Sequence, residues 1–531
     1  MDTKALRQKI LDLAIRGKLV PQDPNDEPAG VLLERIREQK QQMLKEGKLK
    51  KKDIKNDTII FKGEDNLHYE KFQDGTVKCI EDEIPFEVPE GWRWARVRDI
   101  AMVKGGKRLP KGASFSEEIT THAYIRVTDM KNHSVNISNL RYISDEIFSA
   151  IKNYTIAKDD LYVTIAGTIG VVGEIPDKLD GMNLTENAVK ITNIAINKSF
   201  LCIILQTDFV QQQFQDKTHQ VAMPKLALER ILSTLIPICP YVQQLQIVDR
   251  FQICDNFLST IDTEKEELQK IVSLSKYKIL DLAIRGKLVP QDPNDEPASV
   301  ILESIRIEKE ELIKQGKIKR DKKESVIFKG DDNSYYEKIG NKVNCIDEEI
   351  PFELPQNWEW SRLQTICYPI TDGTHKTPTY SDSGYIFLSA KNITTGKINW
   401  NDIMYIPKSL HDELYSRVSP KMNDILLAKN GTTGVAAIVD RECEFDIYVT
   451  LALLRVVNNN ISSQYLLKII ASDTIQDYFK SSLKGIGVPN LHLEHIRTTL
   501  IPIPPINEQN KIAERIYQYY SLLDSIVQNI E

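Results

Sequence analysis

The sequence predicts an α+β protein in which two globular heads are separated by two long antiparallel coiled-coil helices, with the halves related as a circular repeat by an approximate two-fold axis. Three observations predict this fold. The segment Lys9–Ala29 (KILDLAIRGKLVPQDPNDEPA) returns without a change at Lys278–Ala298. Other segments recur in the same order. Apolar residues follow spacings of three and four positions in the middle and at the end of the chain, which is typical of a coiled coil.

The repeat extends over the whole chain. Glu83–Trp94 (EIPFEVPEGWRW) corresponds to Glu349–Trp360 (EIPFELPQNWEW), and Leu235–Pro240 (LIPICP) corresponds to Leu500–Pro505 (LIPIPP). The chain therefore consists of two tandem copies of one unit. Joining its end to its beginning recreates nearly the order found in the middle, which is why the repeat is circular. A protein built in this way reads two things of one kind, or one thing at two places.

Six segments follow from this pattern. We expect an N-terminal repeat helix with a basic linker at residues 1–83, a first head (head 1) at 84–241, a central long helix at 242–290, a second basic linker at 291–349, a second head (head 2) at 350–506 and a C-terminal helix at 507–531. The length of 531 residues by itself predicts three or four domains.

Composition excludes several classes of protein. Apolar residues make up 41% and charged residues 27% of the chain, which is ordinary for a soluble globular protein. No apolar run approaches the ~18 residues of a membrane span, and the N-terminus lacks the apolar core of a signal peptide. The seven cysteines form no CxxC pair, so we expect no zinc site or disulfide framework and a reducing cytoplasm. Cys79 and Cys345 are expected to be half-buried.

The first linker begins with two helices. Residues 1–17 predict a short helix that Gly17 ends, and Val31–Glu46 predicts a second, amphipathic helix. Each copy then carries a basic cluster, which is either a solvated helix end or a set of phosphate contacts. The clusters are Lys45, Lys48, Lys50, Lys51, Lys52 and Lys55 in the first copy, and Lys314, Lys317, Lys319, Arg320, Lys322 and Lys323 in the second.

Head 1 has the pattern of a compact α+β domain. Trp92 and Trp94 are expected to anchor its core. Short β-rich runs bounded by Gly and Asn predict strands, and Phe200–Phe214 predicts one helix. The expected strands are Ala123–Val127, Leu161–Ile165, Val171–Ile175 and Ala188–Ile191.

The two long helices are expected at Val242–Ile284 and Glu508–Ile530. At ~1.5 Å per residue the first would span roughly 60 Å. Their apolar seams predict a helix–helix and subunit interface. The seam residues are Ile247, Phe251, Leu258 and Ile261 in the first helix, and Ile512, Ile516, Tyr519, Leu523 and Ile526 in the second.

Several further motifs occur in both copies in the same order. The second copy has Val488–Leu491 (VPNL), Leu500–Pro505, Glu508-Gln509 and the heptad helix, and the first has Met223–Leu226 (MPKL), Ile236–Pro240 and Gln243-Gln244. The heads carry Ala166–Gly170 (AGTIG), Lys429–Gly434 (KNGTTG) and, in head 2, Asp372–Pro378 (DGTHKTP). With these motifs the chain resembles the DNA specificity subunits of type I restriction–modification systems over essentially its whole length.

The resemblance implies a function. Each head would be a target-recognition domain that reads one half of a split double-stranded DNA site, and the two helices would set the gap between the halves. The helices would also present matching surfaces to two methylase (modification) subunits, which motor–nuclease (restriction) subunits would join. S-adenosylmethionine, ATP and magnesium would be bound by those partners, with no cofactor in this chain. The dissimilarity of the heads implies two different half-sites.

The sequence contains no convincing catalytic motif. It has no Asn/Asp-Pro-Pro-aromatic loop of adenine methyltransferases and no GxxxxGK[ST] phosphate loop. His492 and His495 lack a Cys or carboxylate partner at a zinc spacing, so no metal is expected. We therefore expect a non-catalytic recognition subunit.

DNA contacts must come from local basic regions, because Lys plus Arg number 69 against 75 Asp plus Glu, a net charge of −6. In head 1 we expect contacts from a loop without acids and from the end of the next strand: Lys104, Lys107, Arg108 and Lys111, then Arg126, Lys131 and Asn132. Gly106 and Gly112 are expected to let this loop approach a DNA backbone; the alternative is a flexible solvated loop. In head 2 the matching residues are Thr374, His375, Lys376, Lys391, Asn392, Lys429 and Asn430.

Two alternatives stay open at this point. The negative net charge would also suit a duplicated coiled-coil scaffold that binds only proteins. The identical block Lys9–Ala29 is explained either by a partner surface that docks twice or by repeated DNA that serves as a crossover point for exchanging heads.

Overall fold

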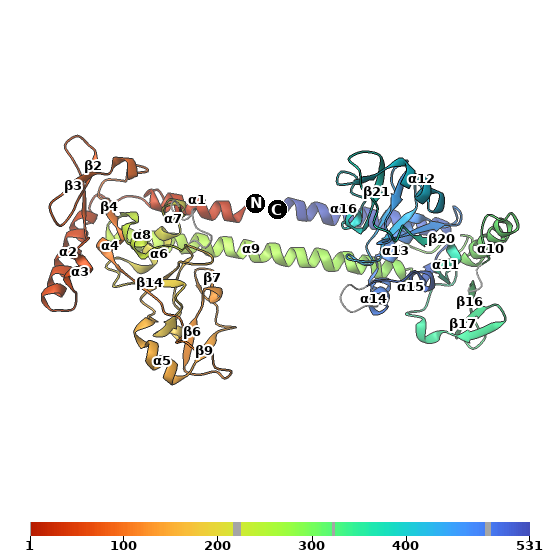
Figure 1. Ribbon diagram of the computed structural model, residues 1–531, viewed down its shortest axis with the longest axis horizontal. Helices are drawn as coiled ribbons and strands as arrows, with labels where there is room; N and C mark the ends of the chain where they lie inside the picture. The colour runs from red at the N-terminus through yellow and green to blue at the C-terminus, as the bar shows by residue number, and fades with distance from the viewer. Residues whose placement is uncertain (1, 216–224, 321–323, 484–489, 531) are drawn as a thin grey trace. The chain divides into compact units, whose positions relative to one another are not determined.

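The structure, a computed structural model, describes residues 2–215, 225–320, 324–483 and 490–530. Its contacts divide the chain into two compact units, Met1–Glu264 (unit 1) and Lys265–Glu531 (unit 2), rather than into three or four domains. Helix α9 (Tyr241–Ile284) contributes its first part to unit 1 and its last part to unit 2. Each unit mixes helices with small sheets, which confirms the α+β class (Figure 1).

Unit 1 alternates short helices and strands before α9. In chain order its elements are α1 (Thr3–Ile15), α2 (Ala29–Lys45), α3 (Lys51–Ile54), β1 (Ile59–Lys62), β2 (His68–Lys71), β3 (Val77–Cys79), β4 (Arg93–Arg96), α4 (Val97–Ile100), β5 (Met102–Gly105), β6 (His122–Ile125), β7 (Met130–Lys131), β8 (Ser134–Val135), β9 (Arg141–Ile143), α5 (Asp145–Ile151), β10 (Thr155–Ile156), β11 (Leu161–Thr164), β12 (Val172–Glu174), β13 (Met182–Leu184), β14 (Ala188–Thr192), α6 (Lys198–Leu205), α7 (Asp208–Gln215), α8 (Leu228–Ser233) and β15 (Leu235–Ile238).

Unit 2 repeats most of this order after α9. Its elements are α10 (Ala298–Lys314), β16 (Ser325–Lys329), β17 (Tyr335–Ile339), β18 (Lys342–Cys345), β19 (Glu359–Arg362), α11 (Leu363–Ile366), β20 (Cys367–Asp372), β21 (Tyr385–Leu388), β22 (Met404–Ile406), α12 (Lys408–Arg417), β23 (Ile425–Ala428), β24 (Ala436–Ile438), β25 (Phe445–Ile447), β26 (Leu451–Val456), α13 (Ser463–Ile470), α14 (Asp473–Ser481), α15 (Leu493–Thr498), β27 (Leu500–Ile503) and α16 (Ile506–Ile530).

Each head contains two main sheets. In head 1 the antiparallel order is β12-β11-β14-β5, and the second sheet is β10-β13-β6-β9, in which β13 and β6 are parallel. Head 2 has the orders β20-β26-β23-β24 and β22-β21-β25, again with one parallel pair, β21 and β25. In unit 1, Figure 1 shows α5, β6 and β9 away from α9, whereas α6 and α8 lie near it.

The predicted strands of head 1 are confirmed as β6, β11, β12 and β14. The single helix predicted at Phe200–Phe214 is wrong, because α6 ends at Leu205 and α7 begins at Asp208. The hydroxyl of Thr207 donates to the carbonyl of Ile204 at 2.7 Å, which closes α6 and turns the chain. Trp92 and Trp94 are buried core residues, as predicted.

The terminal helices pair with α9 inside their own units. In unit 1, Thr3 Oγ1 donates to Asp262 Oδ1 at 2.6 Å, and Arg7 Nε lies 2.5 Å from Asp255 Oδ1, so α1 runs antiparallel to the first part of α9. In unit 2, Tyr520 donates its hydroxyl to the carbonyl of Lys276 at 3.0 Å. Each unit therefore closes its N-terminal helix on its own C-terminal helix. The separation of the heads by these helices stays a prediction.

The linkers are attached to the heads by buried ion pairs at equivalent positions. Arg96 makes a two-point contact with Glu70 at 3.1 and 2.8 Å. Arg362 makes the same contact with Glu337 at 3.0 and 2.8 Å. Burial raises the pKa of each glutamate, but the hydrogen bond from the guanidinium group acts against burial, and the pKa is lowered. The two-point geometry fixes each linker sheet on strand β4 or β19.

A lysine, half-buried in unit 1 and buried in unit 2, ties each linker helix to the same region. Lys40 on α2 lies 2.7 Å from Asp57 and donates to the carbonyl of Arg98 at 2.7 Å. Lys309 on α10 lies 2.6 Å from Glu324 and donates to the carbonyl of Gln364 at 3.1 Å. These two lysines are structural.

The basic clusters that follow these helices are exposed along their described length. Two of their residues form surface ion pairs, Lys48 with Glu46 at 2.8 Å and Arg320 with Glu310 at 2.5 Å. Lys322 and Lys323 lie outside the described residues. Cys79 and Cys345 are exposed rather than half-buried, because the outer strands β3 and β18 present all of their side chains to solvent.

Candidate nucleic-acid interface

The candidate interface of each head lies at the edge where its two parallel strands end. Parallel strands place their carboxyl ends at the same edge of a sheet, so the residues that follow them gather there. In head 1 the loop after β5 joins this edge, since Lys107 N donates to the carbonyl of Leu184 at 2.9 Å. In head 2 the loop after β20 does the same, since Thr374 N donates to the carbonyl of Ile447 at 3.1 Å. The heads therefore place different side chains on the same scaffold.

A glycine makes each of these loops fit. A Cβ atom on Gly106 would overlap the carbonyl of Thr185, and one on Gly373 would overlap the carbonyl of Ile447. Gly106 therefore packs against the protein's own chain, and the prediction that it lets the loop approach a DNA backbone stays a prediction. Gly112 has a φ of +85° and no atom within 4 Å of the Cβ position, so its surroundings are open.

The basic loop of head 1 is exposed at Lys104, Lys107, Arg108 and Lys111, as the DNA-contact prediction requires. Arg108 is paired with Glu186 at 2.7 Å but remains 79% exposed. Burial raises the pKa of Glu186, but the hydrogen bond from Arg108 acts against burial, and the pKa is lowered. Glu186 belongs to the connection between β13 and β14 and was not predicted from the sequence. It places one carboxylate beside a loop that contains none.

The other predicted residues of head 1 lie on a short hairpin and its approach. Arg126 makes a two-point contact with Asp129 at 3.0 and 2.7 Å and also donates to the carbonyl of Asn139 at 2.9 Å. Lys131 and Asn132 are exposed at the turn between β7 and β8, where Asn132 has a φ of +52°. Arg126 is therefore held in place, whereas the hairpin tip is open to solvent.

In head 2 the exposed predicted residues are His375, Lys376 and Lys391, with Thr374 and Asn430 half-buried. Arg417 on α12 supports their loop, because its Nη2 donates to the carbonyl of Gly373 at 2.6 Å and to that of Asp372 at 3.2 Å. No sequence pattern pointed to Arg417, which arrives from a helix that is distant along the chain.

Two predicted residues of head 2 are not at the surface. The ammonium group of Lys429 is buried and lies 2.5 Å from Asp372 Oδ2. Asn392 is buried, accepts from the backbone of Ser389 at 2.9 Å and donates to the carbonyl of Asp402 at 2.6 Å. The polar atoms of Lys429 and Asn392 are therefore used inside the head, and the DNA contacts predicted for these two residues stay predictions.

Most residues of the predicted interface seam pack inside their own unit. Five of its residues are buried in the unit to which they belong: Ile247, Phe251, Leu258, Ile512 and Ile516. Ile261 and Leu523 are half-buried, and Tyr519 and Ile526 are 38% and 40% exposed. Other apolar side chains of the same helices face solvent, among them Phe257 at 69% and Leu522 at 62%, which occupy equivalent positions in the two copies. These residues, and not the buried seam, are therefore the exposed apolar positions of the long helices.

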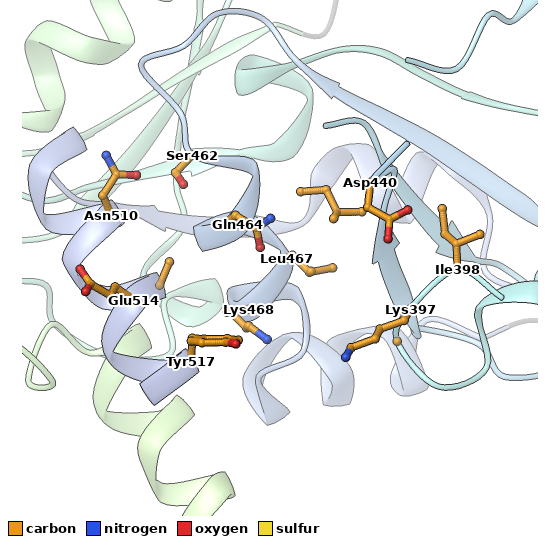
Figure 2. Close-up of a pocket in the computed structure, with 13 residues that line it drawn as sticks. Lys397, Ile398, Asp440, Ser462, Gln464, Leu467, Lys468, Asn510, Glu514 and Tyr517 are labelled. Carbon is orange, nitrogen blue, oxygen red and sulfur yellow. The ribbon is translucent and has the colours of Figure 1, made fainter. Parts of the chain in front are cut away.

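A cavity of about 630 Å³ opens in unit 2 where α16 meets α13 and head 2. Figure 2 shows Lys468 and Tyr517 on the wall formed by the two helices, and Lys397 on the opposite wall. Burial and then the charge of Lys397 lower the pKa of Lys468. The ammonium group of Lys468 lies 5.7 Å from the centre of the Tyr520 ring. Asp440 and Glu514 line the same cavity, so it contains two lysines and two carboxylates.

One group among the described residues has the composition of a metal site: His68, Glu81 and Glu87. The second copy has Tyr335, Asp347 and Glu353 at these positions. His68 N donates to Glu81 Oε2 at 2.8 Å, and Tyr335 N donates to Asp347 Oδ1 at 2.5 Å. The second copy therefore forms the same backbone-to-carboxylate hydrogen bond with a tyrosine in place of the histidine. This hydrogen bond holds the linker sheet together and accounts for the position of Glu81 beside His68.

Parts of the repeated motifs lie outside the described residues, namely Met223, Pro224, Val488 and Pro489. Asn490 forms a bridge with Asn430, and Leu491 N donates to the carbonyl of Lys429 at 2.9 Å. Within the described part of the chain, none of the helices combines the length and the apolar character needed to cross a membrane.

Comparison with known proteins gives the same result for both units. The family described as type I restriction modification DNA specificity domain matches twice, at residues 89–271 and 355–531. The type I restriction enzyme EcoAI specificity subunit of Escherichia coli is 27% identical, over 97% of this chain and 88% of that relative. The EcoEI specificity subunit of Escherichia coli is 25% identical, over 99% of this chain and 91% of that relative.

A solved chain from a structural study of complex assembly and conformational transition of the type I R-M system has a related fold. It is 15% identical with a TM-score of 0.50, and the similarity covers 84% of this chain and 94% of that one.

Proposed function

We propose a function on the premise that the chain belongs to the family of type I restriction modification DNA specificity domains. It is the DNA sequence-specificity subunit of a type I restriction–modification system. The observation that carries this conclusion is the double match of the family, once in each unit, along nearly the full length of two specificity subunits.

Each head reads one half of a bipartite double-stranded DNA site. Support comes from the equivalent sheet edge in each head. The loop after β5 in head 1 and the loop after β20 in head 2 occupy the same place in the fold and present different side chains. Lysine and arginine neutralise phosphates, and Arg, Lys and Asn also pair with base edges. Lys107 and Arg108 in head 1 and His375 and Lys376 in head 2 are the exposed residues on which this assignment rests.

The long helices set the gap between the half-sites and dock two methylase subunits, which in turn bring the motor–nuclease subunits. The exposed apolar residues of α9 and α16, Phe257 and Leu522, support docking of one methylase on each copy. The cavity beside α16, lined by both lysines and carboxylates, gives unit 2 a polar surface for its partner. S-adenosylmethionine, ATP and magnesium belong to those partners, and this chain performs recognition without catalysis.

The alternative of a scaffold that binds only proteins is less well supported. A net charge of −6 favoured it, but the basic loop of head 1 is exposed and contains no acid. A scaffold would also need no pair of equivalent loops with dissimilar polar residues.

The function is tested by mapping adenine methylation across the host genome with and without this gene. Loss of one split motif is expected on deletion, and return of the same motif on complementation. A chain in which residues 84–241 are replaced by a foreign head should change one half of the motif and leave the other half and the gap unaltered. An unchanged methylation map after deletion would contradict the proposal.

A further inference from the structure

The two units build the same joint with different side chains at two adjacent positions, Val242 and Gln243 in unit 1 and Asn507 and Glu508 in unit 2. In unit 1 the joint holds α9, the identical block and head 1 together. Trp92 Nε1 donates to Gln22 Oε1 at 3.0 Å and to Gln243 Oε1 at 2.9 Å. Gln243 in turn donates its amide to Asp26 Oδ2 at 3.1 Å. The Gln243 side chain therefore acts as acceptor toward the indole and as donor toward the aspartate.

Unit 2 replaces Gln243 with Glu508 and keeps the other three residues as Trp358, Gln291 and Asp295. Trp358 Nε1 donates to Glu508 Oε2 at 3.0 Å, and Gln291 Nε2 donates to Glu508 Oε1 at 2.5 Å. Glu508 is 2% exposed and Asp295 is 8% exposed. An ionised carboxylate accepts hydrogen bonds only, so Glu508 in that state cannot make the donation that Gln243 makes.

The structure shows the consequence at Asp295. Its Oδ1 accepts from Asn507 Nδ2 at 2.8 Å, but its Oδ2 is buried and has no hydrogen-bond partner among the described residues. In unit 1 the corresponding atom, Asp26 Oδ2, is the one that accepts from Gln243. Glu508 corresponds to Gln243, so a proton on Glu508 would supply the donor that Asp26 Oδ2 has in unit 1. Without that proton, Glu508 and Asp295 are both buried carboxylates, and the charge of Asp295 disfavours ionisation of Glu508.

We propose that Glu508 is protonated in the folded chain near neutral pH and donates its O–H to Asp295 Oδ2, so that the joint of α16, the second identical block and head 2 loosens when this proton is released to solvent. The protonated carboxyl reproduces the donor and acceptor pattern of Gln243. Unit 1, with an amide at this place, has no corresponding titration.

The groups that face Glu508 agree with this assignment. Burial and then the neighbouring charge of Asp295 raise the pKa of Glu508 to about 7, against the hydrogen bond from Trp358 and the charge of Lys511. Tyr465 lies on the head side; its phenol is buried, donates to the carbonyl of Pro502 at 2.8 Å and stays neutral, since burial raises its pKa well above the usual value. A raised pKa in the folded state means that the stabilisation is present at low pH and is lost as the pH rises through about 7.

Hydrogen exchange of the full chain, followed by mass spectrometry from pH 6 to pH 8, tests the proposal on peptides that cover the first turn of α16. After correction for intrinsic exchange, the wild-type turn is expected to lose about threefold to tenfold in protection over this range, since each pH unit below the raised pKa of about 7 changes the opening equilibrium up to tenfold and the effect levels off above it. Glu508→Gln, which installs the residue of unit 1, should make the protection independent of pH.

Two further variants keep the test decisive if Glu508→Gln folds poorly. Gln243→Glu should install the same pH dependence at the start of α9, beside Asp26. Asp295→Asn should move the midpoint of the wild-type transition to lower pH, because the like charge is gone and the new amide can donate to the Glu508 carboxylate. Equal pH dependence in wild type and Glu508→Gln, or an unchanged midpoint in Asp295→Asn, would overturn the proposal.

Discussion

The ammonium group of Lys429 at the end of β23 lies 2.5 Å from the carboxylate of Asp372 at the end of β20, and both side chains are buried. Asp372 opens the loop whose exposed residues are the candidate DNA contacts of head 2. The ion pair therefore fixes the start of that loop from inside the head, and it gives Lys429 a structural role in addition to the DNA contact predicted for it.

Replacing Lys429 with Met should lower the free energy of unfolding of unit 2 by about 3–5 kcal/mol, because Asp372 would stay buried without a counter-charge. Urea unfolding of the full chain measures this. Lys391→Met, at an exposed residue of the same head, serves as control and should change stability by no more than ~0.5 kcal/mol. Equal effects of the two substitutions would show that the buried pair contributes little.

The double substitution Lys107→Ala and Arg108→Ala should weaken binding to the first half-site. If both side chains contact phosphates, the slope of log affinity against log salt should become shallower by about two. Gel shifts on the mapped site at several salt concentrations measure both quantities. Lys178→Ala, exposed elsewhere on head 1, is the matched control. Unchanged affinity and slope in the double variant would remove this loop from the interface.

Gly17→Ala and Gly286→Ala should destabilise units 1 and 2 to a similar extent. Both glycines have positive φ, at +63° and +66°, and a Cβ atom would come within 2.6 Å of Pro89 in one unit and 2.5 Å of Pro355 in the other. Gly47 has a φ of +72° with nothing within 4 Å, so Gly47→Ala adds only the backbone strain of about 1 kcal/mol.

In thermal unfolding, Gly17→Ala and Gly286→Ala should have lower melting temperatures than Gly47→Ala. This result would support internal packing as one reason why the block Lys9–Ala29 is repeated without change, because each copy meets the same proline and tryptophan. If Gly17→Ala were as mild as Gly47→Ala, packing would not explain the identity, and identical codons in the two blocks would then favour recombination.

Asp99 should make the stability of unit 1 depend on pH in the acidic range. Burial raises its pKa from 3.8 to about 6, against hydrogen bonds from the backbone of Thr58 and Arg96. The folded state then holds the proton more tightly than the unfolded state, so stability present below about pH 4 is lost as the pH rises to about 6. The loss amounts to about 3 kcal/mol at 1.36 kcal/mol per pKa unit.

The measurement is the free energy of unfolding from pH 4 to pH 7 in wild type and in Asp99→Asn, taken as a difference so that other titrating groups cancel. The wild type should lose stability relative to the variant as the pH rises. A difference of the opposite sign would mean that the backbone hydrogen bonds outweigh burial and lower the pKa. Unit 2 has Thr365 at the corresponding position and provides no such carboxylate.

The sequence by itself determined the duplication, the α+β class and the extents of the long helices. Tyr241–Ile284 and Ile506–Ile530 begin and end within two residues of the expected bounds, because proline, glycine and apolar spacing act over a few neighbouring residues. The family was recognisable for the same reason, since its motifs are short and occur in a fixed order.

Only the tertiary structure decided which polar side chains are free to meet a partner. Lys429 is buried because Asp372 approaches it from another strand. Arg417 was missed because it supports the loop of Gly373 from a distant helix, and Glu186 was missed because β13 brings it beside Arg108. The same holds for Glu508, whose sequence neighbours give no sign of Asp295. Charge partners of this kind are joined by packing across long separations in the chain, and no local pattern specifies them.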